Sequence, residues 1–133
     1  MTDAQNIPEN LRYTKDHEWV RLEGDTATVG ITDHAQKALG EITYVELPPV
    51  GKVVKPSDEL AAVESSKAAS DVYAPIGGTV SETNGMLEEA PETINASPYE
   101  DGWICKLYEI SAGDADSLMT AEKYRTLLEQ EEA

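Results

Sequence analysis

The most constraining feature of this sequence is a lysine, Lys67, set between two strand-like runs, Glu59 to Glu64 and Asp71 to Ala74. Most of the residues that join these runs are serine and alanine, and this pattern predicts a tight β-hairpin. Such small side chains cannot cover a neighbour, so we expect the long stem of Lys67 to stand alone in solvent, open to another protein's active site. Position alone favours an ordinary solvated lysine over a modification site, since small residues around a turn are common.

The length and charge of the chain limit the classes of function. Its 133 residues fit a single domain with a modest core. It carries 26 acidic and 10 basic residues, for a formal net charge of -16, and such a surface repels nucleic-acid phosphates and anionic lipid. We therefore expect no nucleic-acid or membrane partner. The acidic excess fits docking to basic patches on partner proteins, and it also fits adaptation to high salt.

The cysteine content and the start of the chain indicate a cytoplasmic protein. Cys105 is the single cysteine, lies in an apolar run and is expected to be a small core residue. No stretch approaches the length of a membrane-spanning helix. The first residues include Asp3 and Glu9, with no base before Arg12, unlike a signal or transit peptide. We expect residues 1–10 to be a loosely docked arm and residues 11–128 to form the core of one domain.

Most of the chain is predicted to form β-strands. Alternating apolar residues around the turn at Gly24 indicate a hairpin near the N-terminus. Thr32 is suited to cap a short helix over residues 33–39, and Gly40 would end that helix in a left-handed conformation. The most strand-like run, 103–110, is expected at the centre of a sheet. The predicted strands cover residues 13–23, 26–31, 42–47, 59–64, 71–74, 79–83 and 103–110.

A short internal repeat indicates how these strands are arranged. Pro49 to Val54 and Pro75 to Val80 share a proline, a β-branched residue, a glycine and a closing valine. Both copies lie between strands, which predicts two similar halves packed face to face in a mainly β sandwich. Residues 85–96 show little periodicity and are interpreted as an exposed loop with one helical turn. Apolar residues at three- and four-residue steps predict an amphipathic helix from Thr120 to about Glu131, lying across the sandwich.

The sequence offers few groups for catalysis. His17 and His34 lie on different predicted elements and neither has a metal-ligand spacing with another residue, so we expect no metal site. His17 and Glu18 would form an acid–base pair only with suitable geometry, and a histidine hydrogen-bonded at a sheet edge is the favoured interpretation. The Gly77-Gly78 pair lacks the lysine and helix of a phosphate-binding loop. We therefore do not expect an enzyme.

The residues around Lys67 favour a modification site. Glu64 to Pro75 resembles the lipoyl-lysine motif of the glycine cleavage system H protein family. The resemblance extends from about Leu11 to Leu128 and includes the C-terminal helix, which free-standing lipoyl domains of 2-oxo acid dehydrogenases lack. The other similar segments are Tyr13 to Trp19, Val29 to Gln36, Leu39 to Glu41, Val45 to Pro48, Asn95 to Tyr99 and Gly102 to Trp103.

The resemblance implies a carrier with a mainly β fold of the barrel-sandwich hybrid type, as in lipoyl and biotinyl carriers. Lys67 would be amide-linked to lipoic acid by a lipoate ligase or octanoyl transferase. The arm would accept an aminomethyl group from glycine decarboxylase, the P protein, and present it to aminomethyltransferase, the T protein. Dihydrolipoyl dehydrogenase, the L protein, would reoxidise the arm. The chemistry would belong to the cofactor, while the protein supplies placement.

Three carboxylates match positions of interest in that family. Glu18 and Asp71 correspond to a cleft in which the loaded arm would dock, since a carboxylate attracts the protonated amine of the carried group. A solvated carboxylate is the alternative for each. Glu64 and Asp71 are also expected to help the ligase recognise the hairpin. The sequence departs from the family at Ser66, where an apolar residue is more frequent, and at Ala38, which is histidine in some members.

Other classes of protein share parts of this pattern. Biotin carriers set the lysine between methionines, whereas Ser66 and Ala68 flank Lys67, so biotin is not expected. A protein that relays lipoyl or octanoyl groups to other complexes would share the motif. An unmodified interaction module would keep the fold alone. The resemblance favours a monomeric lipoyl carrier of the glycine cleavage system.

Overall fold

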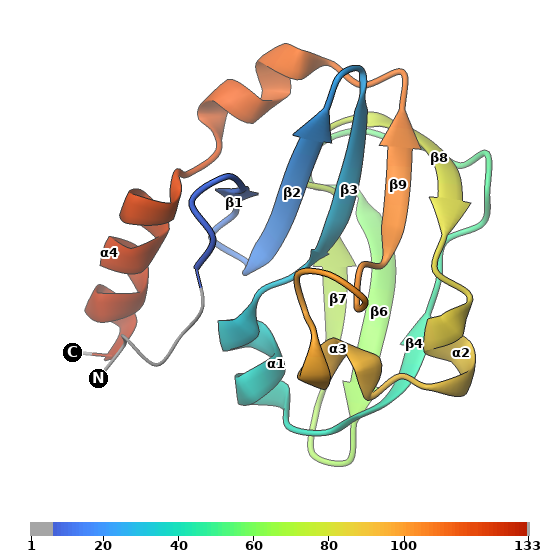
Figure 1. Ribbon diagram of the computed structural model, residues 1–133, viewed down its shortest axis with the longest axis vertical. Helices are drawn as coiled ribbons and strands as arrows, with labels where there is room; N and C mark the ends of the chain where they lie inside the picture. Colours follow the sequence, from blue (N-terminus) through green and yellow to red (C-terminus); the bar gives the residue numbers. More distant parts are fainter. Residues whose placement is uncertain (1–6, 133) are drawn as a thin grey trace.

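The computed structural model describes residues 7–132, and residues 1–6 and 133 lie outside the described part. All strand pairs are antiparallel. A six-stranded sheet has the order β1-β2-β3-β9-β8-β5, and a three-stranded sheet with the order β4-β6-β7 lies behind it in Figure 1. The elements are β1 (Arg12–Tyr13), β2 (Glu18–Glu23), β3 (Thr26–Ile31), α1 (Asp33–Leu39), β4 (Ile42–Glu46), β5 (Val53–Val54), β6 (Glu59–Ser65), β7 (Ala69–Tyr73), β8 (Gly78–Thr83), α2 (Met86–Glu89), α3 (Thr93–Ala96), β9 (Cys105–Tyr108), the 3-10 helix η2 (Ala112–Ser117) and α4 (Ala121–Glu132).

The main core lies between the two sheets. Val29 and Leu107 come from the six-stranded sheet and Val63 and Val72 from the three-stranded sheet, and all four side chains are buried. Alternation along each strand directs these residues inward and leaves their neighbours facing solvent. The predicted class, mainly β with two antiparallel sheets, is confirmed.

The two repeated segments, residues 49–54 and 75–80, pair with each other. Strand β5 lies antiparallel to the start of β8, with Val53 opposite Thr79 and Val54 opposite Gly78. An antiparallel pair has local two-fold symmetry. The two copies therefore meet side by side within one sheet.

The first helix and the central strand agree with the sequence. Thr32 Oγ1 accepts a 3.2 Å hydrogen bond from the N–H of Ala35 at the start of α1. Gly40 follows the helix with a φ of +83°, a conformation that favours glycine. Strand β9 lies inside the larger sheet, between β3 and β8, as predicted for the run 103–110, although it spans only Cys105–Tyr108.

Residues 85–96 differ from the prediction. They form two one-turn helices, α2 and α3, and not an exposed loop. Leu87 and Ile94 are 0% exposed and belong to the main core. Pro91 lies between the two turns, where its missing N–H and its ring prevent one continuous helix. Only Leu87 and Ile94 of this segment's large apolar residues are buried, while Met86 is exposed, so the sequence shows no clear amphipathic pattern.

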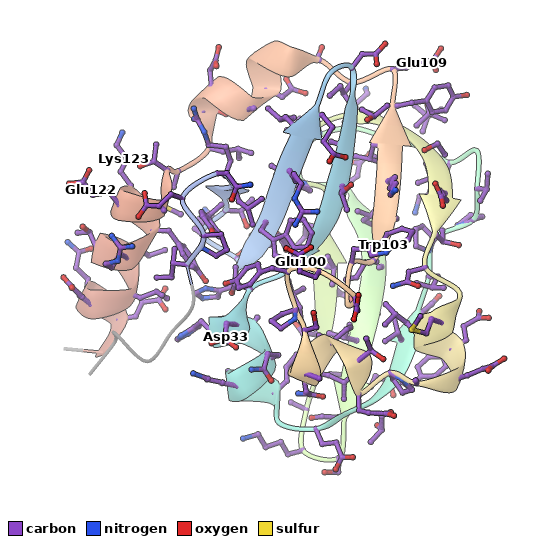
Figure 2. All side chains as sticks on the ribbon, in the orientation of Figure 1. Asp33, Glu100, Trp103, Glu109, Glu122 and Lys123 are labelled. Atoms are coloured by element: carbon purple, nitrogen blue, oxygen red, sulfur yellow. The ribbon has the colours of Figure 1, made fainter. Side chains whose placement is uncertain are left out.

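The C-terminal helix α4 forms as predicted but lies beside β1 at one side of the molecule, and not across the sandwich (Figure 1). Its buried residues are Ala121, Tyr124 and Leu128. Glu122 and Lys123 point away from the domain (Figure 2). The helix therefore buries one apolar stripe against the edge of the larger sheet.

A second, aromatic core fixes α4 in this place. The rings of Tyr13 and Tyr124 stack with centroids 4.6 Å apart, and Trp19 Nε1 donates a 3.0 Å hydrogen bond to the carbonyl of Pro98. Ile7 packs into the same cluster, so the described end of the predicted N-terminal arm is docked. Within residues 7–132, no helix has the length and apolar composition needed to cross a membrane.

The predicted hairpin of β6 and β7 is tied to the end of α1 by a single hydroxyl. Ser65 Oγ donates a 2.6 Å hydrogen bond to the carbonyl of Leu39. The same oxygen accepts from the backbone N–H groups of Lys67 at 3.3 Å and Ala68 at 3.2 Å. Ser65 therefore fixes both the conformation of the turn and its position relative to α1.

Replacing Ser65 by alanine should loosen this turn. We expect Ser65→Ala to lower the free energy of unfolding by about 1–2 kcal/mol, because it removes the acceptor of two amides and the donor to Leu39. Urea unfolding measures the loss, and hydrogen exchange at Lys67 and Ala68 should become faster. Ser66→Ala is the matched control, since Ser66 is exposed and its loss should change stability by less than about 0.5 kcal/mol. Equal effects of the two substitutions would contradict the role of Ser65.

Candidate functional site

Lys67 occupies the turn between β6 and β7, which projects beyond α1 and α3 at the lower end of the molecule in Figure 1. The residue is exposed, and none of the ion pairs within residues 7–132 involves it. A Cβ placed on Gly40 would lie 3.6 Å from Lys67 Cε. The stem therefore passes close to the end of α1, whereas the sequence had indicated a stem isolated in solvent. Its exposure leaves it open to a modifying enzyme.

Glu64 and Asp71 lie on the outer face of the three-stranded sheet. Asp71 is opposite Ala62, and Glu64 is opposite Ala69. Opposite residues of an antiparallel pair point to the same side, and diagonal neighbours lie about 7–8 Å apart. Both acidic residues are exposed. The structure thus brings two of the three predicted carboxylates together beside the lysine-bearing turn.

Glu18 lies elsewhere and is only 2% exposed. Its Oε1 accepts a 2.6 Å hydrogen bond from Thr14 Oγ1, and its Oε2 accepts a 3.0 Å hydrogen bond from the backbone N–H of Tyr73. Burial raises the pKa of the Glu18 carboxyl, and the hydrogen bonds from Thr14 and Tyr73 oppose that rise. A solvated surface carboxylate, one of the two interpretations of Glu18, is therefore excluded.

Strand β7 connects the lysine-bearing turn to Glu18. Within residues 7–132 it is an edge strand that pairs with β6 alone, and the N–H of Tyr73 points to the opposite side, toward Glu18. The strand from Ala69 to Tyr73 spans about 13 Å. At its far end lies a hollow of about 330 Å³ whose lining includes Glu18, Tyr73, Pro75 and Leu118. A flexible group attached to Lys67 would therefore have an open strand edge leading to a sheltered carboxylate.

The two histidines, although distant in sequence, are in contact. The rings of His17 and His34 have centroids 4.5 Å apart. His17 lies in the turn before β2, with a φ of +72°, and its Nδ1 is 2.8 Å from Tyr124 Oη. Burial and the nearby His34 lower the pKa of His17. Because the carboxylate of Glu18 bonds to other partners, His17 and Glu18 do not form an acid–base pair.

The thiol of Cys105 belongs to the core. Cys105 is 0% exposed, and burial raises the pKa of its thiol to about 12. A protonated, buried thiol is a poor nucleophile. Its predicted role as a small core residue is confirmed.

The role of Ser65 in positioning the turn is not evident from the hairpin pattern, in which Ser65 is one of several small residues. A serine just before a turn is a known local signal for a bond from its side chain to the backbone. Its acceptor on Leu39, however, belongs to a different element, so no local pattern reveals it.

Known proteins of one family resemble this chain along nearly its whole length. The family model described as "Glycine cleavage H-protein" matches residues 11–131. The glycine cleavage system H protein of a Psychrobacter species is 56% identical over 124 residues, which cover 92% of this chain and 98% of the relative. The H protein of a Thermus thermophilus strain is 52% identical over 126 residues, covering 95% of this chain and 98% of the relative.

A solved structure agrees with these sequence matches. The crystal structure of a glycine cleavage system H protein from Mycobacterium marinum superposes with a TM-score of 0.82 at 36% identity. The match covers 90% of this chain and 97% of that chain. Fold and sequence therefore agree, and this chain belongs to the glycine cleavage H-protein family.

Proposed function

We propose that this chain carries lipoic acid on Lys67 and acts as the shuttle protein of the glycine cleavage system. The observation that carries the proposal is an exposed Lys67 at the tip of a fixed hairpin, in a chain that belongs to the glycine cleavage H-protein family. Lys67 would hold the lipoyl group, which would supply the dithiolane chemistry for receiving an aminomethyl group from glycine decarboxylase, the P protein, and presenting it to aminomethyltransferase, the T protein. Dihydrolipoyl dehydrogenase, the L protein, would reoxidise the resulting dithiol.

The surroundings of Lys67 fit a covalently attached arm. Its neighbours Ser66 and Ala68 are small and exposed, so they leave room for a ligase to reach the amine. Ser65 fixes the base of the turn, while a group beyond the lysine amine remains free to swing. A tethered group on a fixed anchor has a high local concentration at its partner's site. The protein's contribution is therefore placement, and the reactive chemistry is that of the cofactor.

Replacing Lys67 by arginine tests the attachment. In a host that makes lipoate, we expect the wild-type chain to gain the mass of one lipoyl group and Lys67→Arg to gain none, because a guanidinium is not the amine that a ligase acylates. Intact-mass spectrometry measures this. Lys55→Arg, at another exposed lysine, is the control and should keep the adduct. An unmodified wild-type mass in this host would instead favour an interaction module.

The shuttle role is tested by a separate measurement, the exchange of glycine and bicarbonate. In a reconstituted exchange of glycine and bicarbonate with P protein, the lipoylated chain should support exchange and Lys67→Arg should not. A chain that is lipoylated but inactive in this exchange would be a relay protein that donates lipoyl or octanoyl groups elsewhere. The two measurements together therefore separate attachment from function.

We also propose that Glu64 and Asp71 help the lipoate ligase or octanoyl transferase recognise the hairpin. Both carboxylates are exposed, and the pairing of β6 with β7 puts them on one face beside the turn. Exposed charges of this kind act mainly on the rate of encounter with a partner of opposite charge. The expected partner surface is therefore basic.

Removing the charge of Glu64 tests this recognition. We expect Glu64→Ala to slow lipoylation by purified ligase about two- to fivefold, since an exposed charge pair contributes up to about 1 kcal/mol. Glu46→Ala is the matched control, because Glu46 is exposed, lies opposite Ala62 on the same sheet and is farther from the turn. If Glu64→Ala is modified at the wild-type rate, Glu64 has no recognition role.

Glu18 and Asp71 are proposed to dock the loaded arm through the protonated amine of the carried group. Asp71 lies on β7, between the lysine-bearing turn and Tyr73, and Glu18 contacts the backbone of Tyr73. A carboxylate attracts a cation more strongly where water is excluded, which favours the buried Glu18 over the exposed Asp71. The hollow beside Glu18 would shelter the group from hydrolysis.

The lifetime of the carried aminomethyl group tests docking. We expect Glu18→Gln to shorten this lifetime about tenfold, equivalent to ~1.4 kcal/mol, because it removes a sheltered charge. Asp71→Asn should shorten it about twofold, because its charge is screened by solvent. Formaldehyde release measures hydrolysis, thermal unfolding confirms the fold, and Asp25→Asn in an exposed turn is the control. An unchanged lifetime in a folded Glu18→Gln variant would rule out its docking role.

A further inference from the structure

Three side chains with metal-binding groups meet outside the proposed lipoyl site: His17, His34 and Glu131. His17 lies in the turn before β2, His34 in the first turn of α1 and Glu131 in the last turn of α4. Glu131 Oε1 is 3.5 Å from His17 Nε2 and 4.0 Å from His34 Nε2. One ligand atom from each residue lies within 4.8 Å of the other two.

These separations are close to those of a tetrahedral zinc site. Ligand atoms bound at about 2.0–2.2 Å in tetrahedral geometry lie about 3.4 Å from one another. The contact of Glu131 with His17 already meets this value, and the ligand atoms of the other pairs need to approach each other by up to about 1.4 Å. The Glu131 side chain is 41% exposed, so it is free to make such a movement.

The His17 ring is already oriented by a second layer of hydrogen bonds. Its Nδ1 is 2.8 Å from Tyr124 Oη, which is 2.7 Å from Thr32 Oγ1. If His17 Nδ1–H donates to Tyr124 and the Tyr124 hydroxyl donates to Thr32, the lone pair of His17 Nε2 is left free to face Glu131. Support of this kind on the second ring nitrogen is the usual arrangement of zinc-bound histidines.

The charge around Glu131 also favours a cation. Helix α4 ends in an acidic segment and has no basic residue in its last turn, although the C-terminal end of a helix attracts positive charge. The side chains of His17 and His34 are 20% and 23% exposed, which gives an ion access from solvent. The carboxylate would neutralise part of the charge of the ion.

We propose that His17, His34 and Glu131 bind one Zn²⁺ ion, with water completing its coordination, and that the ion clamps the end of α4 to α1. The spacing of these residues along the chain contains no sign of a ligand set, because each residue comes from a different element. The competing occupant is a proton on His17 Nε2, shared with Glu131. A zinc titration separates the two.

Calorimetric titration with zinc tests the site. All chains carry Lys67→Arg, so that no lipoyl dithiol competes for the metal, and all are first stripped with chelator. Cys105 is buried and does not compete. We expect one Zn²⁺ to bind per chain and to raise the melting temperature. His34→Ala and Glu131→Gln should each weaken binding at least about tenfold.

Glu129→Gln is the matched control, since it removes the same charge from an exposed residue of the same helix turn and should change the affinity less than about twofold. Glu131 is itself exposed, so Glu131→Gln leaves the core intact even if His34→Ala perturbs α1. Substitution with Co²⁺ should give the visible absorption of a tetrahedral ion. No binding of zinc, or equal affinity in the Glu131→Gln and Glu129→Gln variants, would overturn the proposal.

Discussion

The register between β6 and β7 is the constraint on which the rest of the site depends. Val63 and Val72 must face the core, because their burial between the two sheets stabilises the hairpin. A shift of one residue would expose these valines and turn their neighbours inward. With the register fixed, Glu64 and Asp71 necessarily face outward on one side, and the turn with its lysine projects from the end of the sheet. Burial of the two valines therefore determines the direction in which Glu64, Asp71 and Lys67 point, although none of these charged residues contributes to the core.

Glu18 joins the two sheets at the open edge of β7. A buried carboxylate is costly unless it accepts hydrogen bonds, and here Thr14 and the backbone of Tyr73 supply them. In turn, Glu18 satisfies an N–H that an edge strand would otherwise leave to solvent. This contact holds the far end of β7 against β2, while Ser65 holds the near end of the hairpin against α1. Both ends of β7, from the turn at Lys67 to the hollow beside Glu18, are thus fixed.

The aromatic cluster beside β1 has consequences beyond stability. Stacking of Tyr13 on Tyr124 places α4 at the edge of the larger sheet, and the hydroxyl of Tyr124 then reaches His17 and Thr32. The last turn of α4 comes to lie beside the start of α1, where Glu131 meets both histidines. The sequence predicts helix α4 correctly. The position in which α4 packs, however, brings Glu131 to the two histidines, and the sequence does not predict this polar cluster.

Local patterns predicted most of the strands, the capped helix α1 and the hairpin that presents Lys67, because strand alternation, turn residues and caps act between near neighbours in the chain. The run 13–23, predicted as one strand, is divided in the structure into β1 and β2. The two buried helical turns at residues 85–96 are not evident from the sequence, because only the packed core shows that Leu87 and Ile94 are buried. Only the tertiary structure decided which distant groups meet: Ser65 with Leu39, Glu18 with Tyr73, and His17 with His34 and Glu131. Such contacts depend on how separate elements pack to bury apolar surface, and no pattern within one element encodes the position of another.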